Sequence, residues 1–204
     1  MHLSCSGVPQ VEQSRRSVLR CLIAVMASAV GGVACTPAFN WREVRNLEHR
    51  FSVLLPARVA QMTRTIDLDG VALEMTMVGA RAEQALFSVG AATLPRDDAA
   101  LREHALAAMR TAMLNNIAAR QFPDPARGPA SRARAVKMTD ASGAVVGAQD
   151  GIGIEAAGRV AGEAVVLHAV FVARGERIWQ AVAIVPPGLS EQAQTMLDSF
   201  RIIV

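Results

Sequence analysis

Apolar and polar residues alternate in several separate runs of this chain from Phe51 onward, and this alternation constrains its fold more than any other feature. Strict alternation puts successive side chains on opposite faces of a strand, while apolar residues three or four apart mark one face of a helix. Alternating or branched runs predict strands at 51–56, 59–66, 71–78, 85–94, 133–138, 144–148, 160–172, 178–185 and 201–204, the last as an edge strand. The chain is therefore expected to fold around a β-sheet.

The clearest turn signal lies at Asp67–Gly70, between two of these runs. An Asp-Gly pair suits the tight turn of a β-hairpin because glycine adopts positive φ without steric cost. The two carboxylates also resemble the start of a calcium loop, but Val71 and Leu73 stand where further oxygen ligands are needed. A hairpin turn is predicted here rather than a metal site.

Helical spacing of the apolar residues occurs in two places. After Asp97 or Asp98, either of which can cap a helix, apolar residues recur every four positions as far as a loop rich in proline and glycine at 121–129. Ser190 is expected to cap a second helix that ends at about residue 199.

The order strands, helix, strands, helix predicts the fold class. We expect an α+β domain in which a largely antiparallel sheet is covered by one long and one short C-terminal helix. Residues 51–204 are predicted to form this single domain, with residues 35–50 as a linker before it and residues 1–34 as a separate leader.

Three features of the chain resemble a known family. They are the segment Phe51-Ser52-Val53-x-x-Pro56, the hairpin-rich second half, and a closing helix that runs into residues 197–201. Together they resemble the small exported domains of the PsbP-like α/β/α sandwich family, over most of the chain after the leader. The resemblance implies an assembly, binding or accessory protein and implies no catalytic residue.

The leader is typical of an export signal. Arg15 and Arg16 lie in a segment that resembles the twin-arginine export motif, and Cys21–Ala34 follows as an uncharged apolar stretch. As a helix this stretch would rise about 21 Å, which is short of the roughly 30 Å hydrocarbon core of a bilayer. A cleaved signal peptide is predicted, with an uncleaved N-terminal anchor as the alternative.

Cys35 directly follows the apolar stretch, and Gly32-Val33-Ala34-Cys35 resembles a bacterial lipobox with glycine where leucine is usual. Every cysteine lies at or before position 35, so the remaining chain can form no internal disulfide and no cysteine-based zinc site. We expect Cys35 to carry a lipid that tethers an exported protein to the membrane, on the periplasmic side of a bacterial envelope. Cleavage by the general signal peptidase, without lipid, is the alternative.

The charge balance argues against one class of partner. The chain has a formal net charge of +3, but its leader holds three arginines against one glutamate, so the remainder is close to neutral. A domain that binds nucleic-acid phosphates normally has a clear surplus of cations. Nucleic acid is therefore not expected as a partner.

The residues suited to catalysis do not converge in the sequence. His49 and His104 have polar neighbours, and no histidine has a second one at metal-ligand spacing. His168 interrupts an apolar face within a predicted strand, where burial would shift its pKa. Ser88 lacks the glycine pattern of a nucleophile elbow. No catalytic residue, metal or cofactor is predicted.

Glycines are concentrated between residues 143 and 162. Gly151-Ile152-Gly153 lacks the third glycine and the following helix of a phosphate loop. Glycines within a strand more often permit a bulge or a close backbone approach. Close packing is predicted rather than phosphate binding.

The best candidate binding residues are the basic side chains that follow the proline-rich loop. They are Arg127, Arg132, Arg134 and Lys137. Arg132 and Arg134 share one face of an extended segment, which forms a cationic strip suited to a carboxylate, a phosphate or an anionic lipid headgroup. A solvated polar face is the alternative interpretation.

These observations favour a non-catalytic, envelope-associated binding or assembly module whose partner is an envelope protein. Two other functions stay open. A periplasmic small-ligand carrier would need a closed apolar cavity of a few hundred Å³ between sheet and helix. A hydrolase would need a serine and an aspartate within hydrogen-bond reach of His168.

Overall fold

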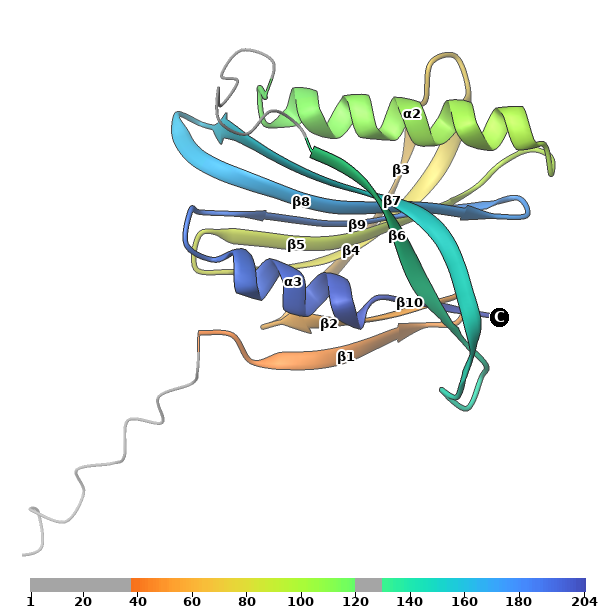
Figure 1. Ribbon diagram of the computed structural model, residues 1–204, viewed down its shortest axis with the longest axis horizontal. Coiled ribbons are helices and arrows are strands. Elements are labelled where there is room, and N and C mark those ends of the chain that lie inside the picture. Colours follow the sequence, from red (N-terminus) through yellow and green to blue (C-terminus); the bar gives the residue numbers. More distant parts are fainter. Residues whose placement is uncertain (1–37, 120–129) are drawn as a thin grey trace, which may run out of the picture. The chain divides into compact units, whose positions relative to one another are not determined.

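The computed structural model describes residues 38–119 and 130–204, which form one ten-stranded sheet and two α-helices (Figure 1). The elements in chain order are β1 (Trp41–Asn46), β2 (Phe51–Pro56), β3 (Val59–Asp67), β4 (Ala72–Ala82), β5 (Ala85–Thr93), α2 (Ala99–Asn116), β6 (Ala130–Thr139), β7 (Val145–Val160), β8 (Glu163–Arg174), β9 (Arg177–Val185), α3 (Ser190–Ser199) and β10 (Arg201–Ile203). Within the described ranges, neither helix is both long and apolar enough to span a membrane.

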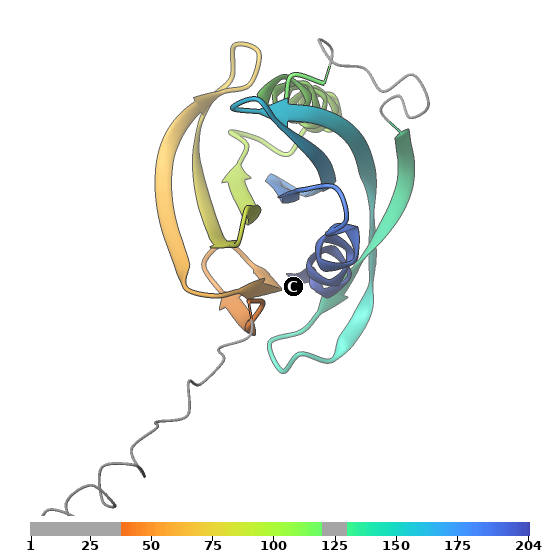
Figure 2. The same ribbon diagram turned by 90° about the vertical axis from the view of Figure 1, so that its left-hand side faces the viewer.

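The strands lie in the order β1-β2-β10-β6-β7-β8-β9-β5-β4-β3. Neighbouring strands are antiparallel except β10 and β6, which run parallel. The sheet curls strongly, so that β2 contacts β4 and β5 across the curl (Figure 2). Part of the apolar surface of the sheet is therefore buried by the sheet itself.

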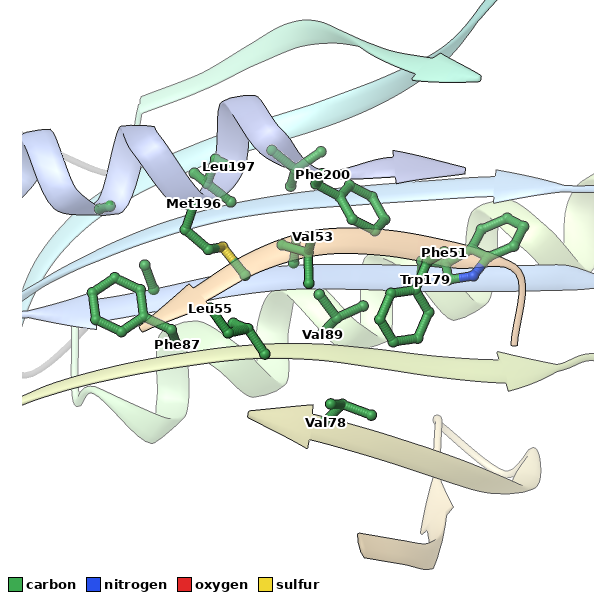
Figure 3. Close-up of a cluster of buried hydrophobic side chains, with 14 of the residues drawn as sticks. Phe51, Val53, Leu55, Val78, Phe87, Val89, Trp179, Met196, Leu197 and Phe200 are labelled. Carbon is green, nitrogen blue, oxygen red and sulfur yellow. The ribbon is translucent and has the colours of Figure 1, made fainter. Parts of the chain in front are cut away.

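Each face of the sheet has its own hydrophobic core, and β8 contributes to both. Its Val170 and Val172 join the cluster under α3, while Leu167 and Phe171 join the cluster under α2. This division follows from the alternation of side chains along a strand. Figure 3 shows the α3 cluster, where side chains of α3, β2, β5 and β9 converge.

The predicted architecture is wrong, although helices and strands occur together as an α+β class requires. Strands make up 58% of the described residues and helices 18%, and the ten strands form a curled, mixed sheet rather than a largely antiparallel one covered by one long and one short C-terminal helix. The physical reason is the curl, because a sheet that packs against itself needs less helical cover.

The C-terminal segment shows two further differences from the prediction. Strand β10 lies inside the sheet between β2 and β6, not at its edge. Ser190 does not cap α3, since Leu189 occupies the N-cap position without a side-chain hydrogen bond and the Ser190 hydroxyl lies instead 3.2 Å from His168.

The expected linker at 35–50 also contains a strand, β1, which pairs with β2 along its whole length.

Several local predictions are confirmed. The hairpin of β3 and β4 closes at Asp67–Gly70, where the Asp67 carboxylate accepts a hydrogen bond from the Gly70 amide and Gly70 has φ of +91°. Asp98 caps α2 by accepting from the Leu101 amide at 2.8 Å. Strands at 51–56 and 85–93 also lie where alternation places them.

The glycine-rich stretch is part of one 16-residue strand, β7, and serves close packing as predicted. A Cβ on Gly158 would lie 2.1 Å from the carbonyl oxygen of Ile117, just after α2. The next residue, Arg159, donates its amide to that same oxygen at 2.7 Å. The chain can approach β7 this closely only because position 158 has no side chain.

Candidate functional site

Helix α3 presents three polar residues on one side. Ser190, Gln194 and Asp198 are four residues apart, a spacing that places them in one row along a helix. Each contacts a polar residue of the sheet, and the contacted residues are His168 on β8 and Arg134 on β6. We call these three residues, together with His168 and Arg134, the polar seam. It lies beside the apolar core under α3.

His168 is the most deeply buried member of this seam, with 2% of its surface exposed. Its Nε2 lies 3.2 Å from the Ser190 hydroxyl, and its Nδ1 lies 3.4 Å from the Gln194 amide nitrogen. The carboxylate of Glu155, its partner in the register of β7 and β8, lies 3.6 Å from the same Nδ1. Every nitrogen of the ring therefore has a polar neighbour.

The hydrogen bonds fix which ring nitrogen of His168 carries the proton. Arg134 can only donate, so the Gln194 oxygen that it contacts at 3.3 Å must accept. That turns the Gln194 amide group toward His168, where it donates to Nδ1. Nδ1 is then unprotonated, and the neutral ring carries its proton on Nε2 and donates it to Ser190.

This tautomer bears on the hydrolase hypothesis. The structure does bring a serine and a carboxylate to His168, as a Ser-His-acid arrangement requires. A general base, however, must offer an unprotonated Nε2 to the serine hydroxyl, and here Nε2 is the donor. The arrangement therefore favours a structural seam over an activated nucleophile.

Burial lowers the pKa of His168 below its usual value of 6.5, and the nearby cations Arg132 and Arg134 lower it further. The Glu155 carboxylate opposes them by stabilising the imidazolium. The neutral ring is thus the form that fits the folded domain, in agreement with the donor and acceptor pattern of the seam.

The predicted basic strip lies along β6 beside the end of α3. Arg134 and Lys137 line a hollow of about 390 Å³, together with Asp198 and with Arg201 at the start of β10. Arg132 is exposed two residues before Arg134 on the same face of β6. We call this hollow, lined by 134–137 and by residues of 197–201, the basic hollow.

The cationic side chains of the basic hollow differ in whether they already have a partner within the protein. Arg134 donates to the Asp198 carboxylate at 2.5 Å, and Arg201 donates to the backbone oxygens of Asp198 and Phe200. Lys137 makes no ion pair within the described part of the chain, and neither does Arg132, which lies outside the hollow on the same strand. The hollow therefore combines one paired arginine with cations that remain open to an anionic ligand.

The sequence analysis did not identify three contributors to this region, which are Arg201, Gln194 and Asp198. Arg201 lies far from the basic strip in the chain, and only the parallel pairing of β10 with β6 brings it opposite Lys137. Gln194 and Asp198 could have been found, since their four-residue spacing from Ser190 already marks a polar row on the helix.

The other predicted sites have different outcomes. Arg127, Cys35, Arg15 and Arg16 lie outside the described residues, so their roles stay predictions. Among residues 38–119 and 130–204, no group of three or more His, Cys, Asp or Glu side chains is placed to hold a metal ion.

The carrier hypothesis predicted a closed apolar cavity between sheet and helix. Three hollows of the described chain are open at the surface, and each has charged residues in its lining. The space under α3 is filled by large side chains that are almost fully buried, among them Phe87, Met196 and Phe200. A cavity of the predicted kind is not among these three hollows.

Comparisons with known proteins give similarity at the level of structure only. No protein-family model matches this sequence, and no curated protein matches it either. The structure is similar to the solution structure of cyanobacterial PsbP (CyanoP) from Synechocystis sp. PCC 6803, with a TM-score of 0.47 and 14% sequence identity over 84% of this chain and 96% of that chain. The PsbP-like resemblance predicted from the sequence thus holds as a weak structural similarity.

Proposed function

We propose that this chain is a non-catalytic binding module of the bacterial envelope, exported and tethered by a lipid on Cys35. Its binding site is the basic hollow, and its ligand is an acidic, extended segment of an envelope protein. The observation that carries the proposal is the meeting of Arg134, Lys137 and Arg201 in one hollow of about 390 Å³ with a single carboxylate, Asp198.

An extended segment is favoured by the state of strand β6. β6 pairs with β10 only at 137–139, so on that side no described strand pairs with β6 between residues 130 and 136. Unpaired backbone groups on such an edge can take up a further strand, while neighbouring side-chain sites give specificity. Acidic side chains of the added segment would then reach Lys137 and Arg132.

The polar seam of His168 supports a binding role for the same region. It connects α3 to the sheet through Ser190 and Gln194, and Gln194 in turn holds Arg134. An arginine fixed in this way loses less conformational entropy when it binds an anion. The seam therefore positions a binding residue and needs no catalytic step.

Photo-crosslinking in living cells tests this proposal. A photo-reactive amino acid replaces Ala135, which lines the basic hollow and carries no charge, in the full-length protein. We expect an adduct with an envelope protein, and we expect the substitutions Arg134→Gln and Lys137→Gln to reduce its yield about tenfold through the loss of charge-assisted hydrogen bonds. The matched control carries the photo-reactive group at the exposed Ala60 of β3.

Each outcome of this experiment bears on the proposal. An adduct at 135 that is absent at 60 and depends on Arg134 and Lys137 supports it. Adducts of equal yield at both positions, or adducts unaffected by the two substitutions, would show that the basic hollow is not the binding site.

A further inference from the structure

A second hollow of about 490 Å³ lies where four parts of the chain meet: the β1–β2 turn, the end of β5, the β8–β9 turn and the end of β10. Arg50, Arg174 and Arg177 line it, with Glu176 as the one acidic side chain in its lining. Within the described residues, none of the three arginines forms an ion pair with a carboxylate. We call this set of residues the arginine hollow.

The turn that carries Arg50 is held in place by β9 and β10. Trp179, which is 1% exposed, donates its indole N–H to the His49 carbonyl at 2.8 Å. Arg177 donates to the Glu48 carbonyl at 3.1 Å, and the Ile203 amide donates to the Arg50 carbonyl at 3.0 Å. These bonds hold the backbone of the β1–β2 turn, so Arg50 and Arg177 line the same hollow in the free protein.

The turn that carries Arg174 is fixed in the same way. Gly175 makes the turn with φ of +58°, and its carbonyl accepts a hydrogen bond from Arg102 at 3.2 Å. The neighbouring Glu176 carbonyl accepts the Leu94 amide at 2.7 Å. Both turns are therefore connected to the rest of the domain on either side of the hollow, which is a property of preorganised binding sites.

Arg50 also has an unusual backbone conformation for its residue type. Its φ is +54°, in the left-handed region where glycine or asparagine is the common choice. A non-glycine residue there costs of order 1 kcal/mol. Five other non-glycine residues of the described chain share this conformation, so the φ of Arg50 reflects its tight turn, and the case for a site depends on the three guanidinium groups alone.

We propose that the arginine hollow binds a phosphate group. Guanidinium groups bind phosphate through paired, charge-assisted hydrogen bonds, and three arginines around one space match the several oxygens of a phosphate better than the two oxygens of a carboxylate. The volume lies within the usual range of ligand pockets. Its lining residues are different from those of the basic hollow, and this proposal does not depend on the function proposed there.

The same chemistry occurs in two sources, a soluble phosphate ester and a phospholipid headgroup, and two binding measurements separate them. Isothermal titration calorimetry of the full-length protein with glycerol phosphate and inorganic phosphate tests the soluble source. Co-sedimentation with phosphatidylcholine vesicles, with and without phosphatidylglycerol, tests the headgroup.

The test variant is Arg50→Gln/Arg174→Gln/Arg177→Gln. The matched control is Arg58→Gln/Arg64→Gln/Arg81→Gln, which removes the same charge from exposed arginines that form no ion pair within the described residues. We expect the test variant to weaken phosphate binding at least tenfold and the control to change it less than twofold. Far-UV circular dichroism verifies that each variant is folded.

Arg177 also holds the β1–β2 turn, so Arg50→Gln/Arg174→Gln serves as a second variant that leaves this contact in place. Loss of binding in both test variants supports the site. If the lost binding is to soluble phosphate, the ligand is a soluble phosphate ester; if it is only to phosphatidylglycerol vesicles, the ligand is a phospholipid headgroup. The proposal is overturned if the wild-type protein binds neither probe, or if the control loses binding as much as the test variants.

Discussion

Replacing Gly158 with alanine is expected to destabilise the domain by about 3 kcal/mol, the upper part of the usual range for overpacking. The new Cβ would lie 2.1 Å from the Ile117 carbonyl oxygen and 2.9 Å from the Ile117 Cδ1 atom. The carbonyl is backbone and cannot rotate away. The chain after α2 must therefore shift, and the hydrogen bond from the Arg159 amide to Ile117 is weakened with it.

Gly153→Ala on the same strand is the matched control. A Cβ there would have its nearest neighbours at 3.6 to 3.7 Å, which is ordinary van der Waals contact. Urea unfolding followed by far-UV circular dichroism gives the free energy of unfolding for both variants. We expect a change of less than about 1 kcal/mol for Gly153→Ala, and equal effects at the two positions would contradict the packing of residue 117 on β7.

The stability of the wild-type domain is expected to fall as the pH drops below about 6.5, the ordinary pKa of histidine. Burial lowers the pKa of His168 in the folded state, so between the folded and unfolded pKa values the unfolded chain binds more protons. The stability that the neutral His168 ring contributes is fully present above pH 6.5. It is lost as the pH falls through the lowered pKa of His168 in the folded state. The groups that face the ring are Glu155, Arg132, Arg134, Ser190 and Gln194.

His168→Gln isolates this effect, because glutamine does not titrate and His49 and His104 are present in both proteins. Thermal unfolding midpoints at pH 7.5 and pH 5.0 are the measurement. Between pH 7.5 and pH 5.0, the unfolding midpoint of the wild-type protein should fall by more than that of the variant. A variant whose midpoint falls as steeply as that of the wild type would mean that His168 does not titrate in this way.

The local elements of the fold could be predicted because their signals are local. The Asp67–Gly70 turn, the Asp98 cap and the four-residue apolar spacing that follows Asp98 each depend on residues close together in the chain, and the structure confirms them. The architecture could not be predicted, since the position of β10 depends on pairing with β2 and β6, whose residues are far away in the sequence.

The same distinction explains the candidate sites. Arg132, Arg134 and Lys137 follow one another on a single strand, so the sequence alone marked them. The arginine hollow draws on residues near positions 50, 93, 175 and 203, which only the folded sheet brings together. Local rules predict helix capping for Ser190, because they cannot show that a buried histidine on strand β8 contacts its hydroxyl.

Everything proposed for this protein in the envelope depends on its processing at Cys35. Mass spectrometry of the N-terminal peptide, from native protein purified out of the membrane fraction, measures that processing directly. The predicted peptide begins at Cys35 and carries a diacylglyceryl group. A peptide that begins at Met1 without lipid, on protein found in the cell interior, would contradict the account.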